Sequence, residues 1–231
     1  MLSLEKNNIY KIYMLTNFQI EDLAGRMKIP LEFVGFKNLL PKKIKTNKAY
    51  IINLDDDVCK DTGIQSGGTH WTTFIVMEYP NKKIEGIYFD SYGAPPPEVV
   101  NERMMSNFKM KLPYNTKDIQ SLMNEACGWY CLAFQHFINV YERRTKNLYW
   151  DVEEFLSLFE DLNESVDWKK NEYILKMFFQ PEYPTKAKPI EVISDPDRIT
   201  AGCGDRIDPD VEGAEYAGHV PIQVDVKYVG K

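Results

Sequence analysis

Cys127 is the residue best suited to covalent chemistry, because it stands at the front edge of a helix-like apolar stripe in "ACGWYCLAFQHFINV". A thiol at the start of a helix lies at the positive end of the helix dipole, which lowers its pKa and favours the nucleophilic thiolate. Gly128 follows directly, and its missing side chain would let a substrate carbonyl approach the sulfur. The local sequence also fits a small core residue, which is the interpretation we favour for Cys131 one helical turn later.

A cysteine nucleophile needs a base and a group that orients the base, and His70 and Asp90 are the candidates. His70 follows the flexible segment "SGG" and begins a strand, whereas His136 lies on an apolar helix face and His219 in a polar C-terminal segment. The strand from His70 and the strand ending at Asp90 flank the turn "PNKK", which predicts a hairpin. In a hairpin these two residues come to the same end, within side-chain reach. Taken singly, His70 also fits a structural role and Asp90 a turn former.

Gln120 lies ahead of Cys127 on the segment that leads into the helix, and its side-chain amide could donate to a developing oxyanion together with the Cys127 N–H. A solvated loop glutamine is the alternative. The four cysteines lack paired CxxC spacing, so we expect no metal site, no disulfide framework and mostly reduced thiols.

The elements that position these residues have either strand-like or helical sequence patterns. Helical spacing predicts helices, Val/Ile/Tyr-rich runs predict strands, and Pro97 follows "GAPP" where a short helix can open. The predicted helices cover 16–27, 128–144, 150–163 and 167–179, and the predicted strands cover 49–54, 70–79 and 84–90. Strands followed mainly by helices indicate an α+β architecture.

The composition divides the 231 residues into a globular part, 1–180, and an extension, 181–231. The extension has ten acidic against six basic residues and many prolines and glycines, and only "PIQVDVKYV" (221–229) alternates like a strand. The net charge of −6 gives no general basic field for nucleic acid. Without a signal peptide or a long apolar run, we expect an intracellular protein that is neither secreted nor in a membrane.

The ordered motifs "GGTHW", "YFDSYG" and a glutamine ahead of "ACGWYC" resemble the adenovirus-type maturation proteases and the Ulp1-like SUMO proteases. "FVGFKNLLP", "AYIINLD" and the "PPP" after "DSYG" are most similar to the proteases of virophages and Polinton-type elements. The resemblance implies a papain-like cysteine protease fold, with a central mixed sheet packed against helices and the nucleophile at a helix N-terminus. It implies His70 as base, Asp90 as orienting acid, Cys127 as nucleophile and Gln120 as oxyanion donor.

The resemblance also implies features outside the triad. Trp71 matches an aromatic that covers a narrow Gly-Gly segment of the substrate, although a core strand residue is an equal alternative. Cofactors are not expected; an activating peptide or DNA is known in the adenoviral family, but the acidic charge does not support DNA. Two hypotheses concern the extension: strand 221–229 docks on the sheet in cis, or the enzyme cuts itself between Gly202 and Cys203 in "ITAGCG".

These features predict a viral cysteine endopeptidase that processes capsid or other virion precursor proteins at small-residue, Gly-containing sites. It would act as a monomer in the virion and the host-cell interior. A protease for SUMO or other ubiquitin-like modifiers is the alternative within the same chemistry. A non-enzymatic virion scaffold or binding module is the alternative of another class.

Overall fold

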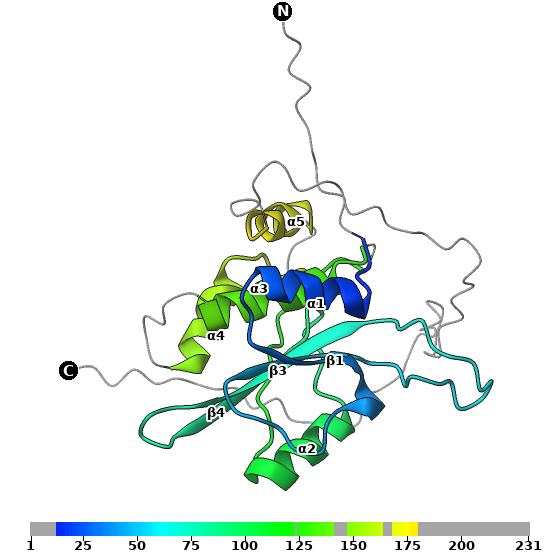
Figure 1. Cartoon of the computed structure of the whole chain (residues 1–231). Coiled ribbons are helices and arrows are strands. Elements are labelled where there is room, and N and C mark those ends of the chain that lie inside the picture. Colours follow the sequence, from blue (N-terminus) through cyan, green and yellow to red (C-terminus); the bar gives the residue numbers. More distant parts are fainter. Residues whose placement is uncertain (1–12, 123, 141–146, 164–167, 180–231) are drawn as a thin grey trace, which may run out of the picture.

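The computed structural model describes residues 13–122, 124–140, 147–163 and 168–179, which form an α+β fold around one sheet (Figure 1). The helices are α1 (Asn17–Arg26), η1 (a 3₁₀ turn, Lys37–Leu39), α2 (Glu98–Phe108), α3 (Cys127–Val140), α4 (Leu148–Ser157) and α5 (Trp168–Met177). The strands are β1 (Leu31–Phe36), β2 (Lys48–Asn53), β3 (Trp71–Glu78) and β4 (Ile84–Phe89). The α+β class and the central mixed sheet are therefore confirmed.

The sheet has the strand order β1-β2-β3-β4, with β1 parallel to β2 and the other neighbours antiparallel. The predicted β3–β4 hairpin is present, and its register runs from Glu78 opposite Ile84 to Thr73 opposite Phe89. β1 was not predicted as a strand. All its residues are half-buried at the edge of the sheet, so "LEFVGF" lacks the alternation of buried and exposed positions that marks a strand.

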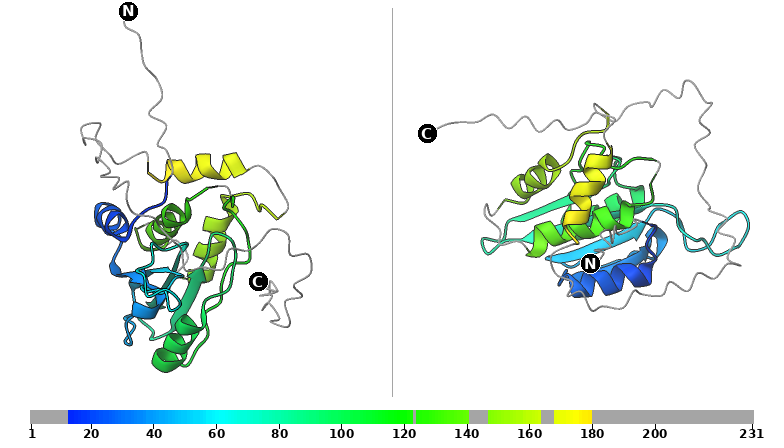
Figure 2. Two further views of the ribbon diagram at one scale, coloured as in Figure 1. Left: turned by 90° about the vertical axis from the view of Figure 1, so that its right-hand side faces the viewer. Right: turned by 90° about the horizontal axis from the view of Figure 1, so that it is seen from above.

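Helices cover both faces of the sheet, with α1, α3, α4 and α5 on one face and α2 on the other (Figures 1 and 2). Successive strand residues point to opposite faces, and here both faces meet helices, so the central strands are buried at nearly every position. The larger cluster contains Ile51, Ile75 and Phe89, and the smaller one contains Tyr50, Phe74 and Tyr88.

Local capping signals explain where the helices begin. Thr16 caps α1 through a capping box with Gln19. Pro97 precedes α2 as its N-cap. Helix α3 begins at Cys127, one residue before the predicted start, and the predicted end at Arg144 lies outside the described residues.

The extension 181–231 also lies outside the described residues, and so do the strand predicted at 221–229 and the cleavage site predicted at Gly202 and Cys203. Within the part of the chain that the structure describes, none of the helices combines the length and apolar character needed to cross a membrane.

Candidate active site

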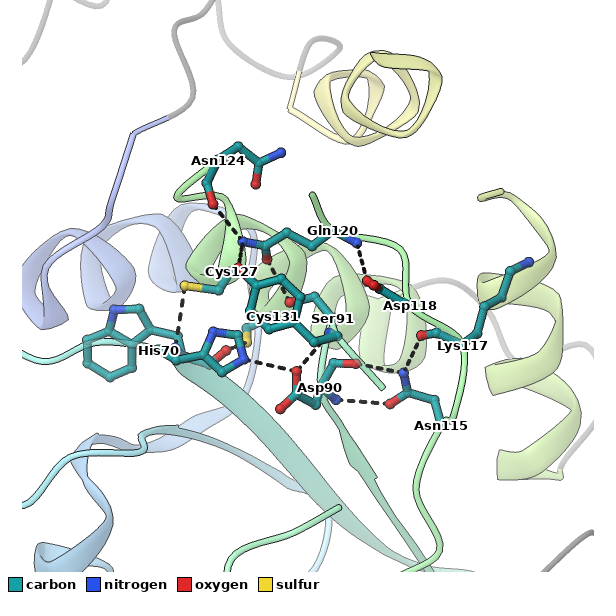
Figure 3. A network of polar contacts seen from close by, with 12 residues as sticks. His70, Asp90, Ser91, Asn115, Lys117, Asp118, Gln120, Asn124, Cys127 and Cys131 are labelled. Atoms are coloured by element: carbon teal, nitrogen blue, oxygen red, sulfur yellow. Dashed lines mark hydrogen bonds and ion pairs between the residues drawn. The ribbon is translucent and has the colours of Figure 1, made fainter. Parts of the chain in front are cut away.

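His70 and Asp90 lie at the same end of the β3–β4 hairpin, as its antiparallel pairing requires (Figure 3). The imidazole Nε2 is 2.9 Å from Asp90 Oδ1. The His70 side chain is 14% exposed, whereas the Asp90 side chain is 1% exposed. The imidazole therefore reaches solvent while a carboxylate holds it from inside the protein.

The segment before His70, expected to be flexible, is tied to the loop after β2 by hydrogen bonds that are buried or partly buried. Asn53 Oδ1 accepts the N–H groups of Asp55 (3.0 Å) and Thr69 (3.2 Å), and Thr69 Oγ1 donates to Asp55 Oδ1 at 2.9 Å. Gly68 has a φ of +79°, and a Cβ there would lie 2.4 Å from the Asn53 amide nitrogen. Only glycine fits this close approach, so the "SGG" segment positions the histidine rigidly.

Asp90 is both a turn former and the partner of His70. The N–H of Gly93 donates to Asp90 O at 2.9 Å, and Asp90 Oδ1 accepts the N–H of Tyr92 at 2.8 Å. Asn115 clamps the main chain, because its Oδ1 accepts the Asp90 N–H (2.9 Å) and its Nδ2 donates to Asp90 O (2.6 Å). The carboxylate is thus fixed by local turn geometry and by a side chain from a distant segment.

Cys127 is the first residue of α3 and lies beside the start of β3. The N–H of Tyr130 makes the first hydrogen bond of the helix, to Ala126 O at 3.0 Å, so the N–H groups of the first turn lack an acceptor within the helix. Cys127 Sγ accepts the main-chain N–H of Trp71 at 3.4 Å. The helix terminus and this N–H both place positive charge near the sulfur.

His70 carries a positive charge at neutral pH. Burial lowers the pKa of its imidazole, but hydrogen bonds and negative charge from Asp90 and Cys127 together outweigh burial and raise the pKa from 6.5 to about 10. An imidazolium next to the sulfur stabilises a thiolate and can protonate a leaving group. The arrangement of His70, Asp90 and Cys127 is therefore suited to nucleophilic catalysis.

The side-chain amide of Gln120 is buried beside this group and fully hydrogen-bonded. Its Oε1 accepts from Ser91 Oγ at 2.7 Å, and its Nε2 donates to the main-chain O of Asn124 and to Oη of Tyr92, both at 3.0 Å. Gln120 is 1% exposed, which excludes the solvated loop glutamine considered from the sequence.

Helix α5 holds the segment that carries Gln120. Asn171 Nδ2 donates to Ile119 O at 3.0 Å, and Glu172 Oε1 accepts from Asn124 Nδ2 at 2.9 Å. Asn171 is fully buried, so this helix holds the segment of Gln120 in place in addition to covering the core.

Trp71 and Gly128 pack against the segment that includes α1. Trp71 is 6% exposed, and its Nε1 donates to Leu15 O at 2.8 Å, as expected for the core alternative. A Cβ on Gly128 would lie 3.2 Å from Leu15 Cβ and 3.5 Å from Ile20 Cδ1. The structure therefore gives both residues a packing role, and their predicted contacts with a substrate stay predictions.

Two residues of the site were missed in the sequence. Tyr92 stacks on His70 with ring centroids 4.7 Å apart and an interplanar angle of 26°. Its place in "YFDSYG", two residues after Asp90, could have indicated its proximity. Asn115 lies 25 residues from Asp90 in an irregular segment, and no local pattern marks it.

The remaining cysteine chemistry differs in part from expectation. Cys127 and Cys131 have free thiols, whereas Cys59 is disulfide-bonded. Among the described residues, no group of three or more histidine, cysteine or acidic side chains is placed to hold a metal ion.

Comparison with known proteins gives little further information. No family model matches this chain, and no curated protein matches it. Among solved structures, the chain is similar to the Xanthomonas campestris effector protein XopD, in a structure of XopD bound to ubiquitin, with 10% sequence identity and a TM-score of 0.34. This match covers 78% of this chain and 96% of that chain.

Proposed function

We propose that this protein is a cysteine endopeptidase that cleaves virion precursor proteins at small-residue, Gly-containing sites. The observation that carries the proposal is the convergence of a charged His70, a buried Asp90 and a helix-initial Cys127 from three separate segments. A cysteine that served only as core would need neither the adjacent imidazolium nor the carboxylate behind it. The sequence motifs that resemble adenovirus-type and Ulp1-like proteases support the class of substrate.

In the proposed reaction, the Cys127 thiolate attacks the carbonyl carbon of the scissile peptide, an S–C bond forms and the carbonyl π electrons move to oxygen. The Cys127 N–H stabilises this oxyanion, and Gln120 belongs to the group of polar side chains next to it. The C–N bond then breaks as the His70 imidazolium gives its proton to the leaving amine. A water molecule attacks the thioester, His70 takes a proton from that water, and the Cys127 thiolate leaves.

The test is to incubate the purified protein and its Cys127→Ala variant with the capsid precursor proteins encoded by the same genetic element, and to map new N-termini by mass spectrometry. We expect cuts after small residues with the wild type and none with the variant. Identical termini in the two reactions would contradict the proposal.

A parallel panel of folded SUMO and ubiquitin proteins, each with a C-terminal Gly-Gly fusion, tests the alternative substrate class. Rapid cleavage of these fusions without cleavage of capsid precursors would favour the modifier-protease alternative. Absence of both activities, with Cys127 reacting with iodoacetamide no faster than glutathione, would favour the non-enzymatic scaffold.

A further inference from the structure

The Gln120 amide has no hydrogen left for a substrate oxygen. One Nε2 hydrogen goes to the main-chain O of Asn124 and the other to Oη of Tyr92. A carbonyl oxygen only accepts hydrogen bonds, so the nitrogen of the amide must face Asn124. The hydroxyl of Ser91 donates to the amide oxygen on the opposite side. Turning this buried amide toward a substrate would therefore break hydrogen bonds that water cannot readily replace.

The hydroxyl of Tyr92 lies next to the Gln120 amide and still has a proton to donate. It accepts from Gln120, and among the residues that the structure describes no acceptor takes its own proton. The Tyr92 side chain is half-buried, and its ring stacks on His70. The hydroxyl thus belongs to a side chain that contacts both the proposed acid–base residue and the proposed oxyanion residue.

We infer that Tyr92 is a further catalytic residue whose hydroxyl donates a hydrogen bond to the oxyanion, while Gln120 holds that hydroxyl in place. The inference rests on the proposed function and changes which donor touches the substrate oxygen. Gln120 then acts through Tyr92, because an N–H donated to a hydroxyl oxygen strengthens the hydrogen bond that the hydroxyl gives.

The electrostatic surroundings keep this donor protonated. Burial and the negative charges of Cys127 and Asp90 raise the pKa of Tyr92 well above its usual value. The phenol therefore donates a hydrogen bond without losing its proton, and no step of the reaction changes its charge. An oxyanion that forms at the Cys127-bound carbon gains this bond only after attack, so the hydroxyl stabilises the transition state more than the bound substrate.

The test is Tyr92→Phe, which keeps the ring that stacks on His70 and removes only the hydroxyl. The substrate is the coumarin amide of N-acetyl-Ile-Thr-Ala-Gly, a sequence that this chain itself contains at 199–202. We expect kcat to fall by about 100-fold while KM changes by less than about twofold, because the lost interaction exists only in the transition state. Tyr79→Phe is the matched control: its hydroxyl bonds Glu85 at 2.8 Å near the opposite end of β3, and its removal should leave kcat unchanged.

A kcat equal to or above that of the wild type in Tyr92→Phe would overturn the inference, since the hydroxyl would then only occupy an amide hydrogen of Gln120. Alkylation of Cys127 by iodoacetamide forms no oxyanion, so its rate should be the same in Tyr92→Phe and the wild type. Slower alkylation would show damage to the His70–Cys127 pair and would also overturn the inference. A wild type that is alkylated at Cys127 but cleaves nothing removes the proposed function and this inference with it. If the wild type cleaves the substrate and Tyr92→Phe cleaves it equally fast, the inference about Tyr92 is wrong and the proposed function stands.

Discussion

Cys127 and Cys131 lie one helical turn apart on α3. Their sulfurs contact two main-chain groups of the same residue, the N–H and the carbonyl oxygen of Trp71. Cys127 Sγ accepts the N–H of Trp71 at 3.4 Å, whereas the thiol of Cys131 donates to the carbonyl oxygen of Trp71 at 3.3 Å. Both cysteines are buried. Their hydrogen-bond roles are nevertheless opposite, because a sulfur that accepts is suited to a thiolate and a sulfur that donates must keep its proton.

The difference shows that position on the helix and neighbouring charge decide the role of a buried cysteine. Burial, together with the negative charges of Cys127 and Asp90, raises the pKa of Cys131 well above its usual value and keeps it neutral. Cys127 has the free N–H groups of the helix start and the imidazolium of His70 beside it. Burial alone would have classified both cysteines as core residues.

The strongest test of this difference is to replace each cysteine by alanine. Cys127→Ala should lower kcat/KM by about 10⁴-fold or more, because it removes the proposed nucleophile. Cys131→Ala should retain activity and lower the free energy of unfolding by about 1–2 kcal/mol, through a small cavity and a lost hydrogen bond. Peptide cleavage and urea unfolding measure the two effects. Equal loss of activity in two stably folded variants would show that the cysteines do not differ as described.

Asp90→Asn should make the surroundings of Cys127 more like those of Cys131. A neutral amide no longer raises the pKa of His70, so we expect kcat/KM to fall by about 10²–10⁴-fold. The activity lost should be smallest at low pH, where more of the imidazole is protonated. Asp22→Asn, at an exposed ion pair on α1, is the control. A pH profile of Asp90→Asn that superimposes on the wild-type profile would contradict the assignment of Asp90.

The charge on His70 also makes stability depend on pH. Its folded-state pKa, about 10, lies above the usual 6.5, so the folded protein keeps a proton that the unfolded chain has lost between these values. The stabilising contribution is complete below pH 6.5 and disappears as the pH rises toward 10. We expect the free energy of unfolding to fall over this window in the wild type, and less in Asp90→Asn and Cys127→Ala. Parallel curves for all three proteins, from urea unfolding at each pH, would count against the charged His70.

Gly128→Ala should have the smallest effect, because its added Cβ meets the side chain of Leu15 at 3.2 Å. The overpacking should exceed the gain in helix propensity and lower the free energy of unfolding by about 1 kcal/mol. We expect kcat to stay near the wild-type value. A large loss of kcat without a change in stability would instead support the predicted role of Gly128 toward the substrate.

Much of the fold followed from local sequence patterns. The turn "PNKK" between two apolar runs predicted the hairpin, and the hairpin placed His70 near Asp90. The apolar spacing after Cys127 predicted α3 to within one residue of its start. The edge strand β1 was missed because an edge position leaves its residues uniformly half-buried, without a period to detect.

The supports of the site were the least predictable part. Asn115 holds Asp90 across 25 residues, Asn53 holds the segment before His70 across 16, and Asn171 holds the segment of Gln120 across 52. Each is a buried asparagine that bonds a main-chain group of another segment. An asparagine in the sequence most often indicates a turn or an exposed position, so its type alone does not reveal such a contact.

The sequence by itself determined most of the helices and the central strands, because hydrophobic periodicity and turn chemistry act over a few neighbouring residues. Only the tertiary structure decided that the start of α3 packs beside the start of β3, so that the N–H of Trp71 reaches Cys127 and its carbonyl reaches Cys131. It also decided that the amide hydrogens of Gln120 go to Asn124 and Tyr92. Such hydrogen bonds join segments far apart in the chain, and their geometry exists only after the helices have packed on the sheet.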